Sequence, residues 1–327
     1  AQKAWQAPAE AYVLLQRQTW VQTMLTQRSS IMPEQVAQTL EQKGIKLVAS
    51  EEEHYPFLLA ELSDSPPLLY YKGQLQPRAE TIAIVGSRKA TAYGKAAAVQ
   101  LGRETVSEGL VVVSGMARGI DAAAHKGALE GHGTTWAFLG CGVDVVYPPE
   151  YQHLAQAILE QGALLSEYTP GTPPEANNFP VRNRLISGAA RGVVVVEAAE
   201  KSGALITVDF ALEQGREVFA VPGPIFSPLS RGTHDLIKQG ATLITGVRDI
   251  LGEVRRQAPS LFPAFSEGND TPAQQKIIAL LSDVPAHIDR IIDESALAPE
   301  DIALTLMELE LQNRIIQLPG QHFVLAR

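Results

Sequence analysis

One pattern recurs between Thr81 and Gly223 and constrains the fold more than any other feature of the sequence. In each repeat, a short run of β-branched residues ends in glycines and small polar residues, and a helix-like stretch follows. The apolar runs are Thr81–Gly86, Leu110–Val113, Thr135–Leu139, Gly192–Glu197 and Glu217–Val221. Continuous apolar strands that alternate with helices predict an α/β fold with a parallel sheet covered on both faces. In such sheets the ligand lies beyond the carboxyl ends of the strands, beside helix N-termini.

Composition limits the classes of protein that this chain can represent. A single cysteine, Cys141, excludes an internal disulfide and fits a reducing cytosol. No apolar run approaches the ~20 residues of a membrane helix, and no basic region precedes an apolar stretch at the N-terminus. We therefore expect a cytoplasmic protein without a membrane partner. The net charge of −9 argues against coating nucleic acid by charge alone, so any site for a polyanion must be a local cluster.

Proline, glycine and periodicity divide the 327 residues into four predicted segments. These are an N-terminal helical domain over residues 1–63, an α/β domain over 64–250, a linker over 251–270 and a compact unit over 271–327. Within the last segment, three helical patterns precede two short strands, which predicts a winged helix. Its third helix, Pro299–Leu311, carries four carboxylates and no lysine or arginine. Carboxylates repel phosphates, so we expect no binding of duplex DNA by this unit.

The loop after the first apolar run has the residues of a phosphate site. Gly86 allows a ligand to approach the backbone, and the following helix N-terminus offers unpaired N–H groups. Ser87 adds a hydroxyl, and Arg88 can form two parallel hydrogen bonds to a phosphate. The alternative is a tight turn with a surface arginine. The position at the end of a buried strand favours the phosphate site.

The second apolar run is followed by the same design, with Ser114, Gly115 and Arg118 in the loop. Asp121 and His125 lie four residues apart on one helix face, where they can orient each other or support a bound base. The alternative is a capping carboxylate and an ordinary helix histidine. A hydrolytic triad of Ser114, Asp121 and His125 is disfavoured, because no G-x-S-x-G pattern surrounds the serine.

A third polar stretch combines cations with an aromatic ring, in the order Phe179, Arg182, Asn183 and Arg184. Arginines can bind backbone phosphates while an aromatic face stacks on a base. We expect Arg88 and Arg182 to act this way, so that their loss weakens binding without unfolding the domain. In the alternative, the ring fills the core and the arginines pair with Glu167 or Glu175.

The fourth apolar run ends at Glu197, and Ser202 precedes the helix that follows, so we place Ser202 in the site and Glu197 in its support. Several other kinds of site are excluded by their missing motifs. There is no cluster of cysteine and histidine with the spacing of metal ligands, no G-x-x-x-x-G-K-[ST] and no G-x-G-x-x-G with a ribose-binding acid. We expect no metal, no cofactor and no catalytic residue.

From about Tyr55 to Gly246 the chain resembles the DNA-processing protein A (DprA/Smf) family. The matching stretches, in order, include IAIVGSRKAT-YG, VVSGMARGIDAAAH, LGCGVDVVYP, NFPVRNRLISG, VVVVEAAEKSGALITVDFALEQGREVFAVPG and RGTHDLIKQGATLI. The resemblance implies an extended Rossmann-like domain with an N-terminal helical domain and a C-terminal winged helix. It also implies a protein without enzymatic activity that binds single-stranded DNA, protects it and loads the RecA recombinase during natural transformation.

Carried onto this sequence, the resemblance implies a DNA pocket formed by Gly86-Ser87-Arg88 and the FPVRNR stretch, and a homodimer through the Rossmann-like domain. Val181 stands where some family members have lysine, which implies a less cationic pocket. The alternative function is a nucleotide hydrolase of the lysine-decarboxylase-like fold. Its P-G-G-x-G-T-x-x-E loop is absent, since this place holds the residues from Glu197 to Ala204.

Overall fold

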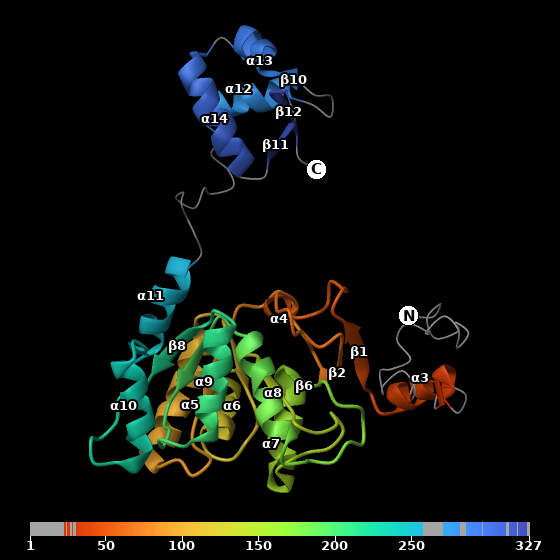
Figure 1. Ribbon diagram of the computed structural model, residues 1–327, viewed down its shortest axis with the longest axis vertical. Coiled ribbons are helices and arrows are strands. Elements are labelled where there is room, and N and C mark those ends of the chain that lie inside the picture. Colours follow the sequence, from red (N-terminus) through yellow and green to blue (C-terminus); the bar gives the residue numbers. More distant parts are fainter. Residues whose placement is uncertain are drawn as a thin grey trace. The chain divides into compact units, whose positions relative to one another are not determined.

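The computed structural model describes residues 23, 25–26, 28, 31–257, 271–281, 286–295, 297–311, 314–318 and 320–325. The chain forms two compact units, Ala1–Gln257 and Ala258–Arg327 (Figure 1). Among the described residues, no helix has the length and apolar character needed to cross a membrane.

A nine-stranded sheet forms the centre of the first unit, with the order β1-β2-β6-β5-β4-β3-β7-β8-β9. The strand β2 pairs antiparallel with β1 and β6, and every other pairing is parallel. The strands are β1 (Lys46–Ala49), β2 (Leu68–Gly73), β3 (Thr81–Val85), β4 (Val111–Ser114), β5 (Thr135–Phe138), β6 (Ala163–Ser166), β7 (Gly192–Val195), β8 (Glu217–Ala220) and β9 (Thr242–Leu243). The predicted α/β fold with a mostly parallel sheet is confirmed.

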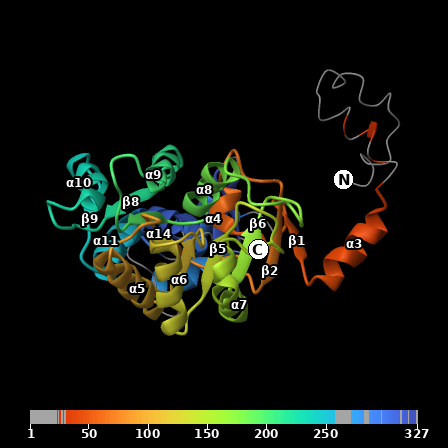
Figure 2. The ribbon, with the colours of Figure 1, turned by 90° about the horizontal axis from the view of Figure 1, so that it is seen from below.

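Helices cover both faces of this sheet, because its central strands are apolar on both sides. Ile82 and Ile84 pack toward α5 (Ala92–Ser107) and α6 (Ile120–Glu130), whereas Ala83 and Val85 belong to the opposite core. Figure 2 shows the two helical layers on either side of the strands. One layer contains α5 and α6 together with α7 (Gln152–Gln161) and α11 (Val247–Gln257). The other layer contains α8 (Asn178–Gly188), α9 (Gly203–Glu213) and α10 (Arg231–Lys238).

Two predicted boundaries need correction. Residues 46–63 are not part of a separate helical domain, because β1 joins the main sheet through β2 and α4 (Phe57–Ala60) packs on its core. Ahead of them, α3 (Pro33–Gln42) is capped by Lys43 and followed by Gly44, whose φ of 62° suits glycine. The predicted linker begins later than residue 251, since α11 continues to Gln257. Most of the predicted N-terminal domain before Ile31 lies outside the described residues, as do residues 258–270.

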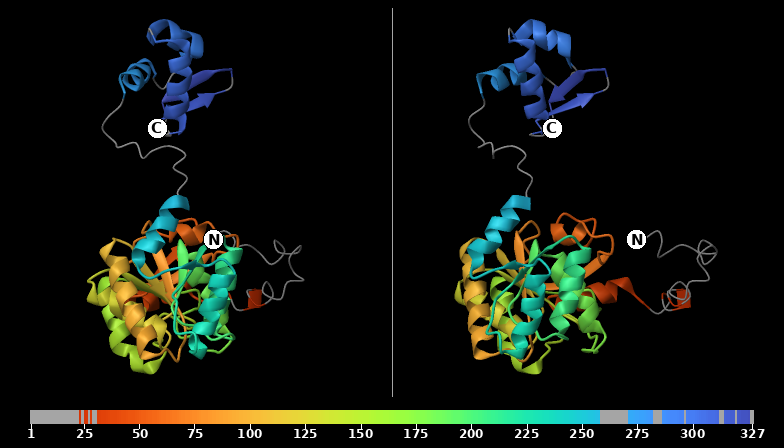
Figure 3. Two further views of the ribbon diagram at one scale, coloured as in Figure 1. Left: turned by 90° about the vertical axis from the view of Figure 1, so that its left-hand side faces the viewer. Right: turned by 60° about the vertical axis from the view of Figure 1, so that its left-hand side comes forward.

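The second unit is a winged helix, as predicted (Figure 3). Its elements are α12 (Pro272–Leu280), β10 (Ala286–His287), α13 (Ile288–Ser295), α14 (Pro299–Leu311), β11 (Ile315–Leu318) and β12 (His322–Leu325). Thr271 caps the N-terminus of α12 in a capping box: its side chain accepts from the Gln274 backbone amide, and the Gln274 side chain accepts from the Thr271 backbone amide. Ile277, Ile302 and Phe323 lie in a small core shared by the helices and the hairpin.

Candidate nucleic-acid interface

A cavity of about 670 Å³ lies at the carboxyl end of the sheet. The loops after β3 and β7 meet the N-terminal parts of α8 and α9 there. The structure brings together in its lining many residues that the sequence singled out: Gly86, Ser87, Arg88, Asp121, Phe179, Arg182, Asn183 and Ser202. Segments separated by about a hundred residues therefore form one site, as the parallel topology requires.

The loop after β3 is held by its backbone and leaves its cations free. The Ser87 amide donates to the Glu197 carbonyl oxygen at 2.7 Å, and the Ser87 carbonyl accepts from the Ile120 amide at 3.2 Å. These bonds fix the loop between the ends of β7 and α6. Arg88 and Lys89 are exposed, and neither has an ion-pair partner in the part of the chain that the structure describes. They remain available to an anion.

The buried Glu197 supports this loop through hydrogen bonds to both of its ends. It is 3% exposed, and its carboxylate accepts from the Thr91 amide at 2.9 Å and from the Thr91 hydroxyl at 2.6 Å. Thr91 in turn caps α5 through the Gly94 amide. Gly94 is needed at this point, because a Cβ there would overlap the Glu197 carboxylate. Glu197 thus positions the start of α5.

Phe179 lies on the wall of the cavity, with two guanidinium groups close to its ring. The ring centroid is 5.6 Å from the Arg88 guanidinium and 5.8 Å from that of Arg182. The Tyr147 ring packs at 5.3 Å with an interplanar angle of 41°. Gly140 lies against the ring edge, where a Cβ would come within 2.9 Å of it. The ring is half-buried and held in place, and its remaining surface lines the cavity.

Arg182 differs from the exposed phosphate ligand that we expected. It is 2% exposed, and its Nη1 donates to the Gly115 carbonyl at 2.9 Å and to the Phe138 carbonyl. Burial lowers the pKa of Arg182 to about 10, while the nearby Asp121 carboxylate favours the charged form. Arg182 therefore brings a fixed positive charge to the cavity wall. It also ties α8 to the ends of β4 and β5, so its loss must affect the fold.

Asp121 occupies a pocket of backbone amides. Its Oδ2 accepts from the Gly115 amide at 3.2 Å and from the Ala117 amide at 3.3 Å. Burial raises the pKa of Asp121, and Arg182 and the two amides act in the opposite direction. The loop between β4 and α6 is thus closed by its own carboxylate. Asp121 therefore holds the loop that lies beside the cavity.

The three residues of the disfavoured hydrolytic triad make separate contacts. Ser114 is fully buried and donates to the Ile84 carbonyl at 2.7 Å. His125 is also fully buried, with Nδ1 at 2.7 Å from the Thr135 hydroxyl. Since that hydroxyl donates to the Val112 carbonyl, it accepts from the histidine N–H. Ser114 and His125 are structural residues of the β4 region, and neither lines the cavity.

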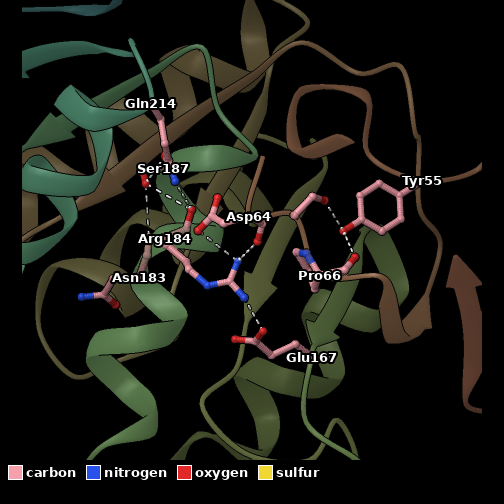
Figure 4. A network of polar contacts seen from close by, with 9 residues as sticks. Tyr55, Asp64, Pro66, Glu167, Asn183, Arg184, Ser187 and Gln214 are labelled. Carbon is pink, nitrogen blue, oxygen red and sulfur yellow. Dashed lines mark hydrogen bonds and ion pairs between the residues drawn. The ribbon is translucent and has the colours of Figure 1, made fainter. Parts of the chain in front are cut away.

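Arg184 points away from the cavity, into a network that joins α8 to residues 55–67 (Figure 4). Its Nη1 donates to the Asp64 carbonyl at 2.8 Å, and its Nη2 pairs with Glu167. Burial raises the pKa of Glu167, and the arginine counteracts this. In the same network the Tyr55 hydroxyl donates to the Pro66 carbonyl at 2.8 Å. Arg184 thus follows the alternative given from the sequence, in which it pairs with Glu167. We therefore leave Arg184 out of the proposed ligand site.

Arg118 stands beside the cavity and has a partner. Its Nε donates to Glu150 Oε1 at 2.6 Å, and both side chains are about half exposed. It lines a small adjoining hollow together with Arg88, Gly115 and Phe179. An exposed ion pair of this kind contributes little to stability and can open to accept a phosphate. Arg118 is therefore a peripheral candidate.

The comparisons with known proteins decide the family. The family described as DNA recombination-mediator protein A matches residues 46–255, and the DprA winged helix domain matches residues 263–321. The chain belongs to the DprA family. The protein Smf of Escherichia coli is 40% identical to it over 297 residues, which are 88% of this chain and 79% of that protein.

Two solved DprA structures share the fold. The X-ray structure of DprA from Streptococcus pneumoniae matches with a TM-score of 0.65 and 40% identity, and covers 71% of this chain and 82% of its own. DprA from Helicobacter pylori, whose single-stranded DNA binding mode has been described structurally, matches with a TM-score of 0.58 and 29% identity. That match covers 65% of this chain and 96% of the other.

Sequence reasoning missed several residues that line the cavity of this DprA chain: Lys89, Tyr147, Ile206, Thr207 and Leu229. Lys89 follows Arg88 directly, and its charge at a strand end was a usable signal. Tyr147 lies after β5 in the stretch GCGVDVVYP, which marked the family but not the site. Leu229 comes from the loop after β8, so this loop also borders the cavity.

A buried neutral histidine predicts a loss of stability in acid. Burial lowers the pKa of His125 to about 3, whereas histidine in an unfolded chain titrates near 6.5. Below about pH 6.5 the unfolded chain binds the extra proton, so the free energy of unfolding falls as the pH drops toward about 3. We expect His125→Gln to lose less stability than the parent between pH 7 and 4.5 in urea unfolding. Equal losses would contradict this account.

Proposed function

We propose that this DprA chain is a cytoplasmic recombination mediator that binds and protects single-stranded DNA and loads the RecA recombinase on it during natural transformation. In this proposal it acts by binding and not as an enzyme, and it forms a homodimer through the Rossmann-like domain. The observation that carries the proposal is the half-buried Phe179 ring beside the unpaired cations Arg88 and Lys89. Family membership and the described binding mode of the H. pylori relative support it.

The chemistry of the cavity favours a single strand over a duplex. A base stacked on Phe179 must be accessible, and in a duplex both faces of each base are covered by its neighbours. Stacking of this kind tolerates every base, because every base has a π-face. Arg88 and Lys89 lie where they can bind the phosphates next to a stacked base, and the fixed charge of Arg182 adds to the local potential. Few phosphate contacts imply a modest dependence on salt.

The DNA contact is tested by comparing Arg88→Ala with Arg118→Ala. Because Arg88 is exposed and unpaired, we expect its loss to leave stability unchanged and to weaken binding of an oligo-dT about tenfold. The slope of log affinity against log salt should fall by about 0.7. Arg118→Ala should have a smaller effect, since Glu150 already neutralises that arginine. Titration at several salt concentrations measures both. If blunt duplex competes as well as single strands, or if Arg88→Ala binds like the parent, the proposed site is refuted.

The mediator step needs its own assay. Full-length protein should accelerate assembly of RecA on DNA that is already covered by a single-strand-binding protein, and Arg88→Ala should lose that acceleration in proportion to DNA affinity. Unchanged RecA assembly with a DNA-binding parent would reject loading and leave DNA binding intact. Release of adenine from AMP would instead favour the hydrolase alternative.

The described part of α14 favours a protein contact over a duplex DNA contact. In winged helices that read duplex DNA, the recognition helix enters the major groove between phosphates. Here the exposed face of α14 carries Asp301, Leu304, Met307 and Glu310, with the two apolar residues 59% and 57% exposed. Acidic groups around an apolar centre suit a protein contact better than DNA. We expect deletion of residues 271–327 to leave single-strand affinity within a few-fold. A large loss, or duplex binding by the full chain that depends on this unit, would overturn this expectation.

A further inference from the structure

The loop between β8 and α10 presents an apolar surface that the proposed DNA cavity does not use. Phe226 is 92% exposed and Ile225 is 74% exposed, the two highest values among the large apolar residues that the structure describes. A fully exposed phenylalanine gains nothing from folding, because its ring stays in water. The backbone of its loop is nevertheless anchored to the rest of the domain.

The loop is fixed at both ends. The Pro222 carbonyl accepts from the Tyr93 hydroxyl at 2.9 Å, and the Gly223 carbonyl lies 3.0 Å from His234 Nε2. At the other end, the Leu229 carbonyl accepts from the Ala198 amide at 2.8 Å. Three prolines within residues 222–228 further restrict the backbone. A partner that covers the Phe226 ring would therefore lose little conformational entropy of the loop.

The same loop is continuous with the cavity. Leu229, three residues after Phe226, lines the cavity wall, as does Lys89 from the loop after β3. Tyr93, in the first turn of α5, is 50% exposed, and its hydroxyl bond to the Pro222 carbonyl joins it to the base of the loop. The loop that carries Phe226 thus borders the cavity through Leu229 and bonds to Tyr93 through Pro222.

We propose that Tyr93 and Phe226 form a second stacking surface, on which bases of a single DNA strand lie after the strand leaves the Phe179 cavity toward β8. The inference rests on the proposed function, because it requires a strand in that cavity. Alternating aromatic rings and cations are the arrangement that binds single strands without sequence preference. Lys89 and Lys201 supply the cations on this side, and neither has an ion-pair partner in the described part of the chain. Arg231 beside them is paired with Glu200.

The test uses the full chain and oligo-dT of two lengths, about 4 and about 16 nucleotides, which span the usual site sizes of such surfaces. The variants are Phe226→Ser, Tyr93→Ala and Tyr93→Phe. Leu212→Ser is the matched control, since Leu212 is 63% exposed at the end of α9 remote from the cavity. We expect Phe226→Ser and Tyr93→Ala to weaken binding of the longer strand about 5- to 100-fold and to leave the shorter strand unchanged. Tyr93→Phe and Leu212→Ser should bind both lengths like the parent.

Stacking is separated from charge by a long strand whose outer nucleotides lack bases. On this strand, Phe226→Ser and the parent should bind equally. If Phe226→Ser binds the ordinary long strand as tightly as the parent, the second surface is rejected while the cavity stands. The inference is also rejected if Phe226→Ser changes the mass of the free protein in sedimentation without changing DNA affinity, because the loop would then contact a second copy. A parent that binds neither oligonucleotide would overturn the proposed function and this inference together.

Discussion

Replacement of Arg182 by alanine is expected to lower the free energy of unfolding by about 3–5 kcal/mol. The guanidinium is 2% exposed, donates to the carbonyls of Gly115 and Phe138, and faces the buried Asp121 carboxylate across Gly115. Its removal leaves two carbonyls without that donor and a buried acid without its neighbouring positive charge. The two carbonyls stand at the ends of β4 and β5, so the damage occurs in the support of the cavity. Urea unfolding followed by circular dichroism measures the change.

The expected loss distinguishes a structural arginine from a ligand-binding one. Arg88→Ala is the matched control, because Arg88 is exposed and should change stability by less than about 0.5 kcal/mol. Asp121→Asn removes the negative charge from the same cluster, so adding it to Arg182→Ala should cost less than the sum of the single effects. If Arg182→Ala unfolds at the same urea concentration as the parent, then the buried hydrogen bonds of Arg182 do not support the fold.

The same residue shows why the site could be predicted only in part. From the sequence, the stretch from Phe179 to Arg184 is a polar segment whose arginines act together. The structure places it on α8, where successive residues are rotated by 100°. Phe179, Arg182 and Asn183 are spaced three and four apart and face the cavity, whereas Arg184 lies two positions from Arg182 on the opposite side. Helical spacing was available in the sequence, but a proline at position 180 obscured the helix.

The fold was easier to predict than the site for a physical reason. Buried parallel strands need continuous apolar runs, and the predicted runs end within two residues of the observed strand ends, such as Val85 and Val195. Side-chain burial depends on partners far away in the sequence. Arg184 forms an ion pair with Glu167, and Arg182 donates to the Gly115 carbonyl. Both partners become neighbours of α8 only through the tertiary fold. The strand β1 lies in a segment that the sequence assigns to the N-terminal helical domain, because its pairing with β2 is likewise not local.

Gly119→Ala is expected to damage both stability and DNA binding. Gly119 precedes α6 with φ 82° and ψ −120°, a conformation that alanine adopts at a cost of about 1–3 kcal/mol. A Cβ at this position would also overlap the Ser87 carbonyl oxygen and crowd the Arg88 backbone. Relief of that overlap must move the loop after β3, which carries the cations of the proposed site. We therefore expect a loss of oligo-dT affinity similar to that of Arg88→Ala, together with a lower free energy of unfolding.

Gly203 provides the control for this substitution within the same cavity. It lines the cavity at the first residue of α9, its φ is not positive, and a Cβ there would meet no atom within 4 Å. Gly203→Ala should therefore leave stability unchanged or slightly raised and should keep DNA affinity, because alanine is the better helix former. Unfolding in urea and oligo-dT titration of both variants decide the matter. If Gly119→Ala keeps parental affinity although its stability falls, the position of the Ser87–Arg88 backbone does not control binding, and Phe179 and Lys89 must supply most of the affinity.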